Sequence, residues 1–194
     1  VAESEVVRVG LNGFGRIGRN VLRAVSADPR IELVGINDVM DAEDMAYLAK
    51  YDTVMGRLDD VTCVEDSLVV GDTSVPLYTV QNPAELPWDD LDVDVALECT
   101  GIFRTKDDAS AHLDAGADNV VISAPPKGEE FVRQIVYGVN HDEYDGEAVV
   151  SCASCTTNSI SPVAMLLDDE YGIEHGLLTT VHAYTGSQSL IDSP

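Results

Sequence analysis

Two cysteines, Cys152 and Cys155, stand three residues apart in the stretch VVSCASCTTNS, and thiols at this spacing support several kinds of chemistry. A structural zinc site needs about four ligands, but Cys63 and Cys99 lie far away in the chain and the histidines show no ligand spacing. We therefore expect no metal site. A dithiol redox pair remains open, because the C-x-x-C arrangement lowers a thiol pKa. The third interpretation takes Cys155 alone as a nucleophile.

The nucleophile interpretation depends on the residues after Cys155. Apolar residues between Ile160 and Leu167 recur at helical spacing, which places Cys155 at a helix N-terminus, where the helix dipole stabilises a thiolate. Pro162 is compatible only with the start of such a helix. His182, in an expected strand over 177–184, is a candidate partner for the thiol, although spacing alone favours a packed strand histidine.

A second group of residues is rich in glycine. Gly13, Gly15 and Gly18 form G-x-G-x-x-G between an apolar strand and a helix, and Asp38 follows twenty residues after the last of them. The three glycines permit, in order, a tight turn, close approach of the backbone to a pyrophosphate, and close helix–strand packing. The helix N-terminus offers free N–H groups to the phosphates. The Asp38 carboxylate accepts hydrogen bonds from adenosine ribose hydroxyls and repels a 2′-phosphate, so the pattern predicts NAD rather than NADP.

Alternating strands and helices must position these residues. The strands are expected at 6–11, 31–36, 93–98, 119–122 and 148–150, with shorter ones near 62–64, 67–70 and 75–80. The helices are expected at 17–25, at 106–115 behind a cap at Thr105, and from Cys155 to about 171. This order predicts an α/β fold with a doubly wound parallel sheet. In such a sheet one edge binds ligands, so we expect a single cleft lined by the residues that follow five strands: 13–18, Asp38, Thr100–Gly101, Ser123 and Cys155.

Composition limits the possible partners. The 194 residues include 11 Lys and Arg against 35 Asp and Glu, a formal net charge of −24, which would repel nucleic acid. The acidic residues are spread along the chain, and we interpret this as adaptation to very high salt, which screens self-repulsion. The first residues lack a signal-peptide pattern, and no window approaches a membrane span. Four scattered cysteines make no disulfide framework, so we expect a reducing cytoplasm.

Several blocks of the chain resemble the phosphorylating glyceraldehyde-3-phosphate dehydrogenases. The blocks are NGFGRIGR at 12–19, IND at 36–38, CTG at 99–101, ISAP at 122–125, SCASCTTNS at 151–159 and TTVHAYT at 179–185. They occur in the order of the family and cover nearly all 194 residues. The resemblance implies a Rossmann-type NAD-binding domain over 1–154 and the start of an α+β catalytic domain over 155–194. It makes Cys155 and His182, 27 residues apart, the catalytic pair.

The resemblance also implies a reaction. Cys155 would attack the aldehyde of glyceraldehyde 3-phosphate, and His182 would raise thiolate reactivity and take the hydroxyl proton as hydride leaves for NAD⁺. Inorganic phosphate would then attack the thioester and release 1,3-bisphosphoglycerate. Ser154 and Thr156 would hold the attacking phosphate and Thr185 the C3 phosphate. Five further positions would contact the cofactor: Arg16 and Ile17 through backbone N–H groups, and Thr100, Gly101 and Ser123 along the groove.

Two departures from the family concern the cysteine motif. The family has asparagine where this chain has Cys152, and a second cysteine where it has Ser159, so the C-x-x-C spacing is not a family feature. We expect Cys155 alone to be essential. Compared with the family the chain is short, and we expect a fragment that is inactive alone, from a protein that forms homotetramers.

Three alternatives stay open at this point. The first is an erythrose-4-phosphate dehydrogenase, which the same blocks would fit. The second is a nucleotide-binding module without catalysis. The third is a dithiol redox protein that uses Cys152 and Cys155.

Overall fold

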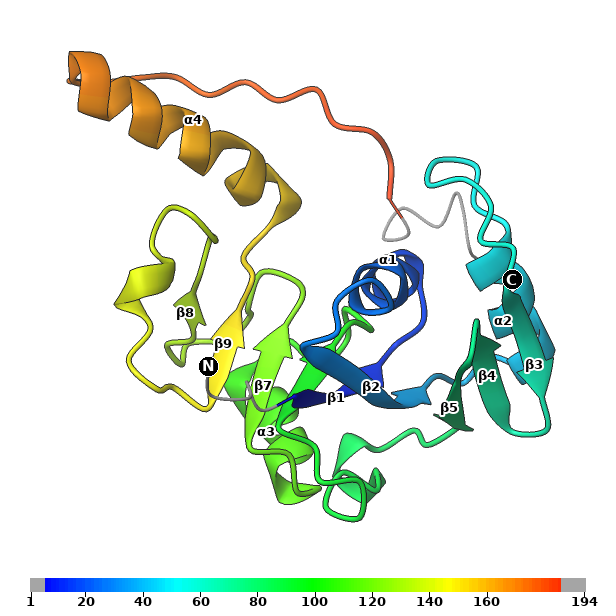
Figure 1. The fold of residues 1–194 in the computed structure, drawn as a ribbon. Helices are drawn as coiled ribbons and strands as arrows, with labels where there is room; N and C mark the ends of the chain where they lie inside the picture. The colour runs from blue at the N-terminus through cyan, green and yellow to red at the C-terminus, as the bar shows by residue number, and fades with distance from the viewer. Residues whose placement is uncertain (1–5, 186–194) are drawn as a thin grey trace, which may run out of the picture.

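A computed structural model describes residues 6–185, and a nine-stranded sheet with the order β3-β4-β5-β2-β1-β6-β7-β9-β8 forms the centre of this part (Figure 1). The strands are β1 (Val7–Asn12), β2 (Ile31–Asn37), β3 (Val61–Val64), β4 (Ser67–Val70), β5 (Thr73–Tyr78), β6 (Val95–Glu98), β7 (Asn119–Ile122), β8 (Arg133–Gln134) and β9 (Val149–Ser151). The helices are α1 (Arg16–Val25), α2 (Ala42–Lys50), α3 (Lys106–Asp114) and α4 (Cys155–Tyr171), with short 3₁₀ turns η1 (Pro83–Glu85) and η2 (His141–Glu143). The expected α/β fold is confirmed.

Strands β3, β4 and β5 form an antiparallel edge, which the expected doubly wound parallel sheet did not include. Glu65 and Asp66 join β3 to β4, and Gly71 and Asp72 join β4 to β5. Each connection contains a residue with positive φ, Glu65 at 52° and Gly71 at 58°. Connections of two residues link antiparallel neighbours, because a parallel crossover needs a dozen residues or more. From β5 to β8 every pairing is parallel.

The register of the parallel strands brings three polar side chains together at the carboxyl edge. Asn12 at the end of β1 lies opposite Asn37 of β2 and opposite Glu98 of β6. All three are buried, at 2%, 4% and 1% exposure. Ligands of open α/β sheets bind outside the carboxyl ends of the strands, so these side chains form the floor of the region that matters for function.

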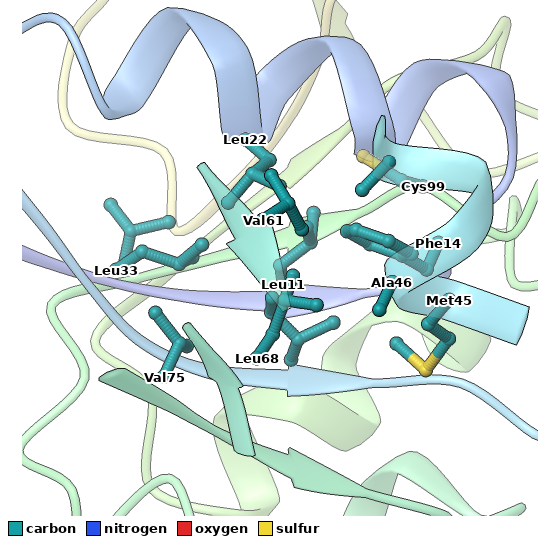
Figure 2. Packing of buried hydrophobic residues seen from close by; sticks show 13 residues of the cluster. Leu11, Phe14, Leu22, Leu33, Met45, Ala46, Val61, Leu68, Val75 and Cys99 are labelled. Atoms are coloured by element: carbon teal, nitrogen blue, oxygen red, sulfur yellow. The ribbon is translucent and has the colours of Figure 1, made fainter. Parts of the chain in front are cut away.

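Apolar side chains pack on both faces of the sheet. Figure 2 shows Leu11 of β1 and Leu22 of α1 in one cluster with Leu68 of the antiparallel edge. Because side chains alternate along a strand, Gly10 faces the other way, where the fully buried Trp88 packs. A Cβ on Gly10 would lie 3.1 Å from the indole ring, so glycine here leaves room for the tryptophan.

All three expected helices are present, and a fourth was not predicted. Helix α1 follows the glycine turn, and α3 has its predicted cap, with Thr105 Oγ1 accepting a hydrogen bond of 3.0 Å from the Asp108 N–H. Helix α2 was not predicted, although its sequence carries ordinary signals. Asp41 stands at its N-cap, and Met45, Ala46 and Ala49 are buried along one face.

The segment after β9 departs from expectation in two ways. Helix α4 runs from Cys155 to Tyr171, as expected, but Pro162 lies inside it rather than near its start. The expected strand over 177–184 is irregular and pairs with no described strand. Leu177 and Val181 are fully exposed in it, because no neighbouring strand or helix covers them. In Figure 1 this segment runs from the end of α4 back towards α1.

Candidate active site and dinucleotide pocket

The glycine turn between β1 and α1 is closely packed at two of its three glycines. Gly13 has φ of +96°, and a Cβ there would lie 2.5 Å from the Thr100 backbone nitrogen. A Cβ on Gly18 would lie 2.1 Å from the Gly13 carbonyl oxygen. Both positions therefore require glycine for the turn to sit against β6 and for α1 to begin where it does.

Gly15, by contrast, faces open space. No atom lies within 4 Å of a Cβ placed there, so the backbone at the start of α1 is accessible to a ligand. Asp38 stands beside the turn, and its carboxylate accepts hydrogen bonds from Phe14 N–H at 2.5 Å and Met40 N–H at 2.9 Å. Asp38 thus fixes the turn as well as presenting a carboxylate at its edge.

A pocket of about 380 Å³ opens at this edge of the sheet. The residues that line it lie at or after the ends of β1, β2, β5 and β6: Asn12, Gly13, Gly15, Asn37, Asp38, Val39, Val80, Gln81, Cys99, Thr100, Ile102 and Phe103. An accessible helix N-terminus on one side and a carboxylate on the other fit a pyrophosphate and a ribose. Four of these residues were predicted to bind the cofactor: Gly13, Gly15, Asp38 and Thr100. The other eight were not, although most of them lie within three residues of a predicted one.

Five other predicted cofactor residues lie outside the lining of this pocket. Gly18 packs beneath the turn, the Arg16 guanidinium pairs with Asp52 at 2.5 Å, and Ile17 is about half exposed. Gly101 adopts φ of +72° just after Thr100. Ser123 follows β7, and its N–H donates to the Glu98 carbonyl.

The residues that follow the five strand ends do not all line one pocket in the structure. Cys155 follows β9, and β9 lies three strands away from β1 in the sheet. Neighbouring strands are about 4.8 Å apart, which separates the two sites by about 14 Å along the sheet. Cys155 lines a second pocket instead, of about 420 Å³, formed with Thr156, Ser159, Ile160 and residues 178–183.

The loop between β9 and α4 holds Cys155 at the first position of the helix. Ser154 is the N-cap, and its Oγ accepts a hydrogen bond of 2.9 Å from the Thr157 N–H. Asn158 clamps the loop, since its Nδ2 donates to the Cys152 carbonyl at 2.7 Å. Ala153 has φ of +59°, a conformation that non-glycine residues rarely adopt. These contacts hold Cys155 at the N-terminus of α4, as the spacing predicted.

His182 lies beside this thiol. Its Nε2 is 3.1 Å from the Cys155 Sγ, and its Nδ1 is 2.5 Å from the Ala183 carbonyl oxygen. A carbonyl only accepts hydrogen bonds, so Nδ1 carries a proton and Nε2 faces the sulfur as a base or, once protonated, as a donor to the thiolate. The structure therefore places His182 beside the thiol, whereas the sequence pattern around it favoured a histidine packed within a strand.

The pair shifts the acidity of both groups. The hydrogen bond to His182 lowers the pKa of the Cys155 thiol, and the Thr156 backbone N–H adds to the effect. The Ala183 carbonyl, followed by Cys155, raises the pKa of His182. The other thiols shift in the opposite direction. Burial raises the pKa of Cys99 to about 12, and atoms crowded around its sulfur raise the pKa of Cys152, although that residue is exposed overall.

The predicted phosphate ligands stand in different places. Thr156 lines the pocket with Cys155 and His182, and Ser154 caps α4 beside it. Thr185 lies three residues beyond His182, outside that lining. Within residues 6–185 no group of three or more His, Cys, Asp and Glu side chains is placed to hold a metal ion. No helix described by the structure has the length and apolar character needed to cross a bilayer.

Comparison with known proteins gives consistent matches over nearly the whole chain. A family model described as the NAD binding domain of glyceraldehyde 3-phosphate dehydrogenase matches residues 7–106, and one described as its C-terminal domain matches residues 154–194. A glyceraldehyde-3-phosphate dehydrogenase from the halophile Haloarcula vallismortis is 65% identical over 193 residues, which are 98% of this chain and 58% of that protein.

More distant organisms give similar matches. Glyceraldehyde-3-phosphate dehydrogenase 2 of Bacillus subtilis is 49% identical over 97% of this chain and 56% of its own length. The cytosolic enzyme of Leishmania mexicana is 48% identical over 97% of this chain and 57% of its own length. The chain thus spans less than three fifths of these relatives. The match to an NAD-binding domain confirms the cofactor predicted from the glycine turn and Asp38.

Proposed function

This chain belongs to the glyceraldehyde-3-phosphate dehydrogenase family, and from that premise we propose that the whole protein converts glyceraldehyde 3-phosphate, inorganic phosphate and NAD⁺ into 1,3-bisphosphoglycerate and NADH. The observation that carries the proposal is the 3.1 Å contact between Cys155 Sγ and His182 Nε2 at the N-terminus of α4. A thiol lacking such a base is a poor nucleophile at neutral pH, whereas a thiolate beside an imidazolium is a good one.

The chain's own residues supply three steps. The Cys155 thiolate adds to the aldehyde carbon and forms a thiohemiacetal, while His182 Nε2–H donates to the oxygen that becomes charged. His182 Nε2 next takes the hydroxyl proton as the carbon loses hydride, which leaves a thioester on Cys155. NAD⁺, when bound, accepts that hydride. A phosphate oxygen then displaces the sulfur, and the Cys155 thiolate is restored.

The cofactor residues are proposed as a set. Open space at Gly15 and the carboxylate of Asp38 support a pyrophosphate and an adenosine ribose at the β1–β2 end of the edge. From there a dinucleotide would extend along the strand ends towards β9. The full set is Gly13, Gly15, Arg16, Ile17, Gly18, Asp38, Thr100, Gly101 and Ser123.

The proposed phosphate ligands are Ser154, Thr156 and Thr185. The position of Thr156 in the Cys155 pocket supports its role, and Ser154 lies next to the nucleophile. We divide the chain into an NAD-binding domain over 1–154 and a catalytic segment over 155–194. The C-terminal family model, which begins at residue 154, supports this division, as does α4, in which no residue is buried.

Partners and location are also proposals. The charge of −24 supports an enzyme that binds small substrates rather than nucleic acid. The Leishmania mexicana relative is named as cytosolic, which supports the cytoplasm. We propose a homotetramer, which light scattering of the whole protein would test directly.

NADH formation by the whole protein tests the function. We expect NADH only when glyceraldehyde 3-phosphate and inorganic phosphate are both supplied, and we expect Cys155→Ser to abolish it. Cys152→Ser is the matched control, since this neighbouring thiol has no part in the reaction. Turnover that persists without phosphate, or in Cys155→Ser, would refute the proposal, and faster turnover with erythrose 4-phosphate would transfer it to that substrate.

A further inference from the structure

A buried carboxylate lies directly beneath the dinucleotide pocket. Glu98 ends β6 at 1% exposure and accepts four hydrogen bonds. One oxygen, Oε1, accepts from the Thr100 N–H at 2.8 Å and from the Thr100 hydroxyl. The other, Oε2, accepts from Asn12 Nδ2 at 2.6 Å and contacts His112 Nε2 at 3.1 Å. A carboxylate has about four acceptor sites, so this one is fully used.

The partners of Glu98 are fixed from behind. Trp88 Nε1–H can only donate, and it lies 3.0 Å from His112 Nδ1. Nδ1 must therefore accept, which places the imidazole proton on Nε2, facing Glu98. His112 and Trp88 are both fully buried, so neither can turn to solvent for another partner.

The same carboxylate reaches several walls of the pocket. Thr100 and Asn12 both line it. Asn12 Oδ1 in turn accepts a hydrogen bond of 2.7 Å from Asn37, whose side chain holds Val80 through bonds to both its N–H and its carbonyl. Glu98 thus connects Thr100, which follows β6, to Asn12 of β1. Through Asn12 it also connects to Asn37 of β2 and to Val80 in the loop after β5.

We infer that Glu98 is a positioning residue for the dinucleotide site: by holding Thr100 and Asn12 at once it sets the spacing of the pocket walls. The inference rests on the proposed function, because it assumes that NAD⁺ occupies this pocket. Glu98 is not a catalytic residue, since its side chain is sealed from the pocket by the residues it holds.

The isosteric change Glu98→Gln tests this role. An amide has one accepting oxygen, so its NH₂ must face two donors whichever way it turns. An NH₂ that faces His112 is unfavourable, because the Trp88 N–H keeps the imidazole proton on Nε2 and so leaves that nitrogen unable to accept a hydrogen bond. The NH₂ therefore turns to Thr100, whose N–H loses its acceptor. We expect the NAD⁺ dissociation constant of the whole protein to rise about tenfold by isothermal titration. The control Glu32→Gln removes an exposed carboxylate paired with Arg8 and should leave the constant unchanged.

A double-mutant cycle separates positioning from general stability. If Glu98 acts through Thr100, Thr100→Val weakens NAD⁺ binding and the combined variant loses well under the product of the two single losses. A merely structural role would lower the melting temperature, leave NAD⁺ affinity within about twofold, and make the losses multiply; that result would overturn the inference.

Two further outcomes are informative. If Glu98→Gln does not fold, the comparison of Thr100→Val with Thr100→Ser replaces it. We then expect the Thr100→Val variant to bind NAD⁺ about tenfold more weakly than Thr100→Ser, because valine lacks the hydroxyl that donates a hydrogen bond to Glu98. Equal NAD⁺ affinities of the two variants would overturn the inference. Absence of NAD⁺ binding by the unmodified protein would overturn the proposed function together with this inference. Normal binding with an unaffected Glu98→Gln variant would overturn the inference alone.

Discussion

Gly18→Ala gives the sharpest test of how the glycine turn is built. By helix propensity alone, alanine at this position of α1 should stabilise the protein by about 1 kcal/mol, because glycine loses more backbone freedom on folding. The structure predicts the opposite sign. The new Cβ would lie 2.1 Å from the Gly13 carbonyl oxygen, whereas ordinary contact begins near 3.4 Å.

The size of the effect is set by that overlap. Relief requires a movement of about 1.3 Å between α1 and the end of β1, taken as 3.4 minus 2.1. The obstructing atom belongs to the backbone, and Gly13 itself packs against the Thr100 backbone, so no side chain can swing away. Overpacking of this kind costs about 1–3 kcal/mol, and a backbone clash belongs at the upper end. After subtracting the propensity gain we expect a net loss of about 2 kcal/mol.

Denaturant unfolding of the whole protein at fixed KCl and protein concentration measures this loss. Gly15→Ala is the matched control, since no atom lies within 4 Å of its Cβ. We expect that variant to keep its stability within about 1 kcal/mol, the range for changes at an N-cap, but to bind NAD⁺ about tenfold more weakly. An unchanged or raised unfolding free energy for Gly18→Ala would show that α1 adjusts freely and would refute the packing argument.

Three other predictions concern the thiols and the charge. Because His182 lowers the pKa of the Cys155 thiol, the thiolate persists to lower pH when both residues are present. His182→Ala should therefore move the pH profile of Cys155 alkylation by iodoacetamide to higher pH. An unchanged profile would show that His182 does not activate the thiol. Mass spectrometry of partly alkylated protein should find Cys155 modified first, ahead of Cys152 and the buried Cys99, whose thiols have raised pKa values; faster labelling of Cys152 would contradict the assignment. Thermal melts should rise steeply from low to molar KCl, because salt screens the charge of −24, and a flat series would argue against salt adaptation.

Local sequence determined much of the fold. Strands β1, β2, β6, β7 and β9 lie within a few residues of their expected positions, because fully buried strands read as short apolar runs. The Thr105 cap and the glycine turn could also be predicted from sequence, since each depends on residue types within a few positions. The antiparallel edge was missed although its two-residue turns are visible in the sequence, because the alternating pattern of the rest of the chain favours parallel strands.

The site divides in the same way. Sequence by itself determined that Cys155 begins a helix and that Asp38 stands beside the glycine turn, because neighbours in the chain decide both. Only the tertiary structure decided that His182 Nε2 faces the Cys155 sulfur, and that the cysteine lines a different pocket from Gly15 and Thr100. It also decided that Glu98, Asn12 and His112 share one buried network, since Asn12 is 86 residues and His112 is 14 residues from Glu98 along the chain. Such contacts depend on strand order and register, which are set by packing between distant segments and leave no periodic signal in either segment alone.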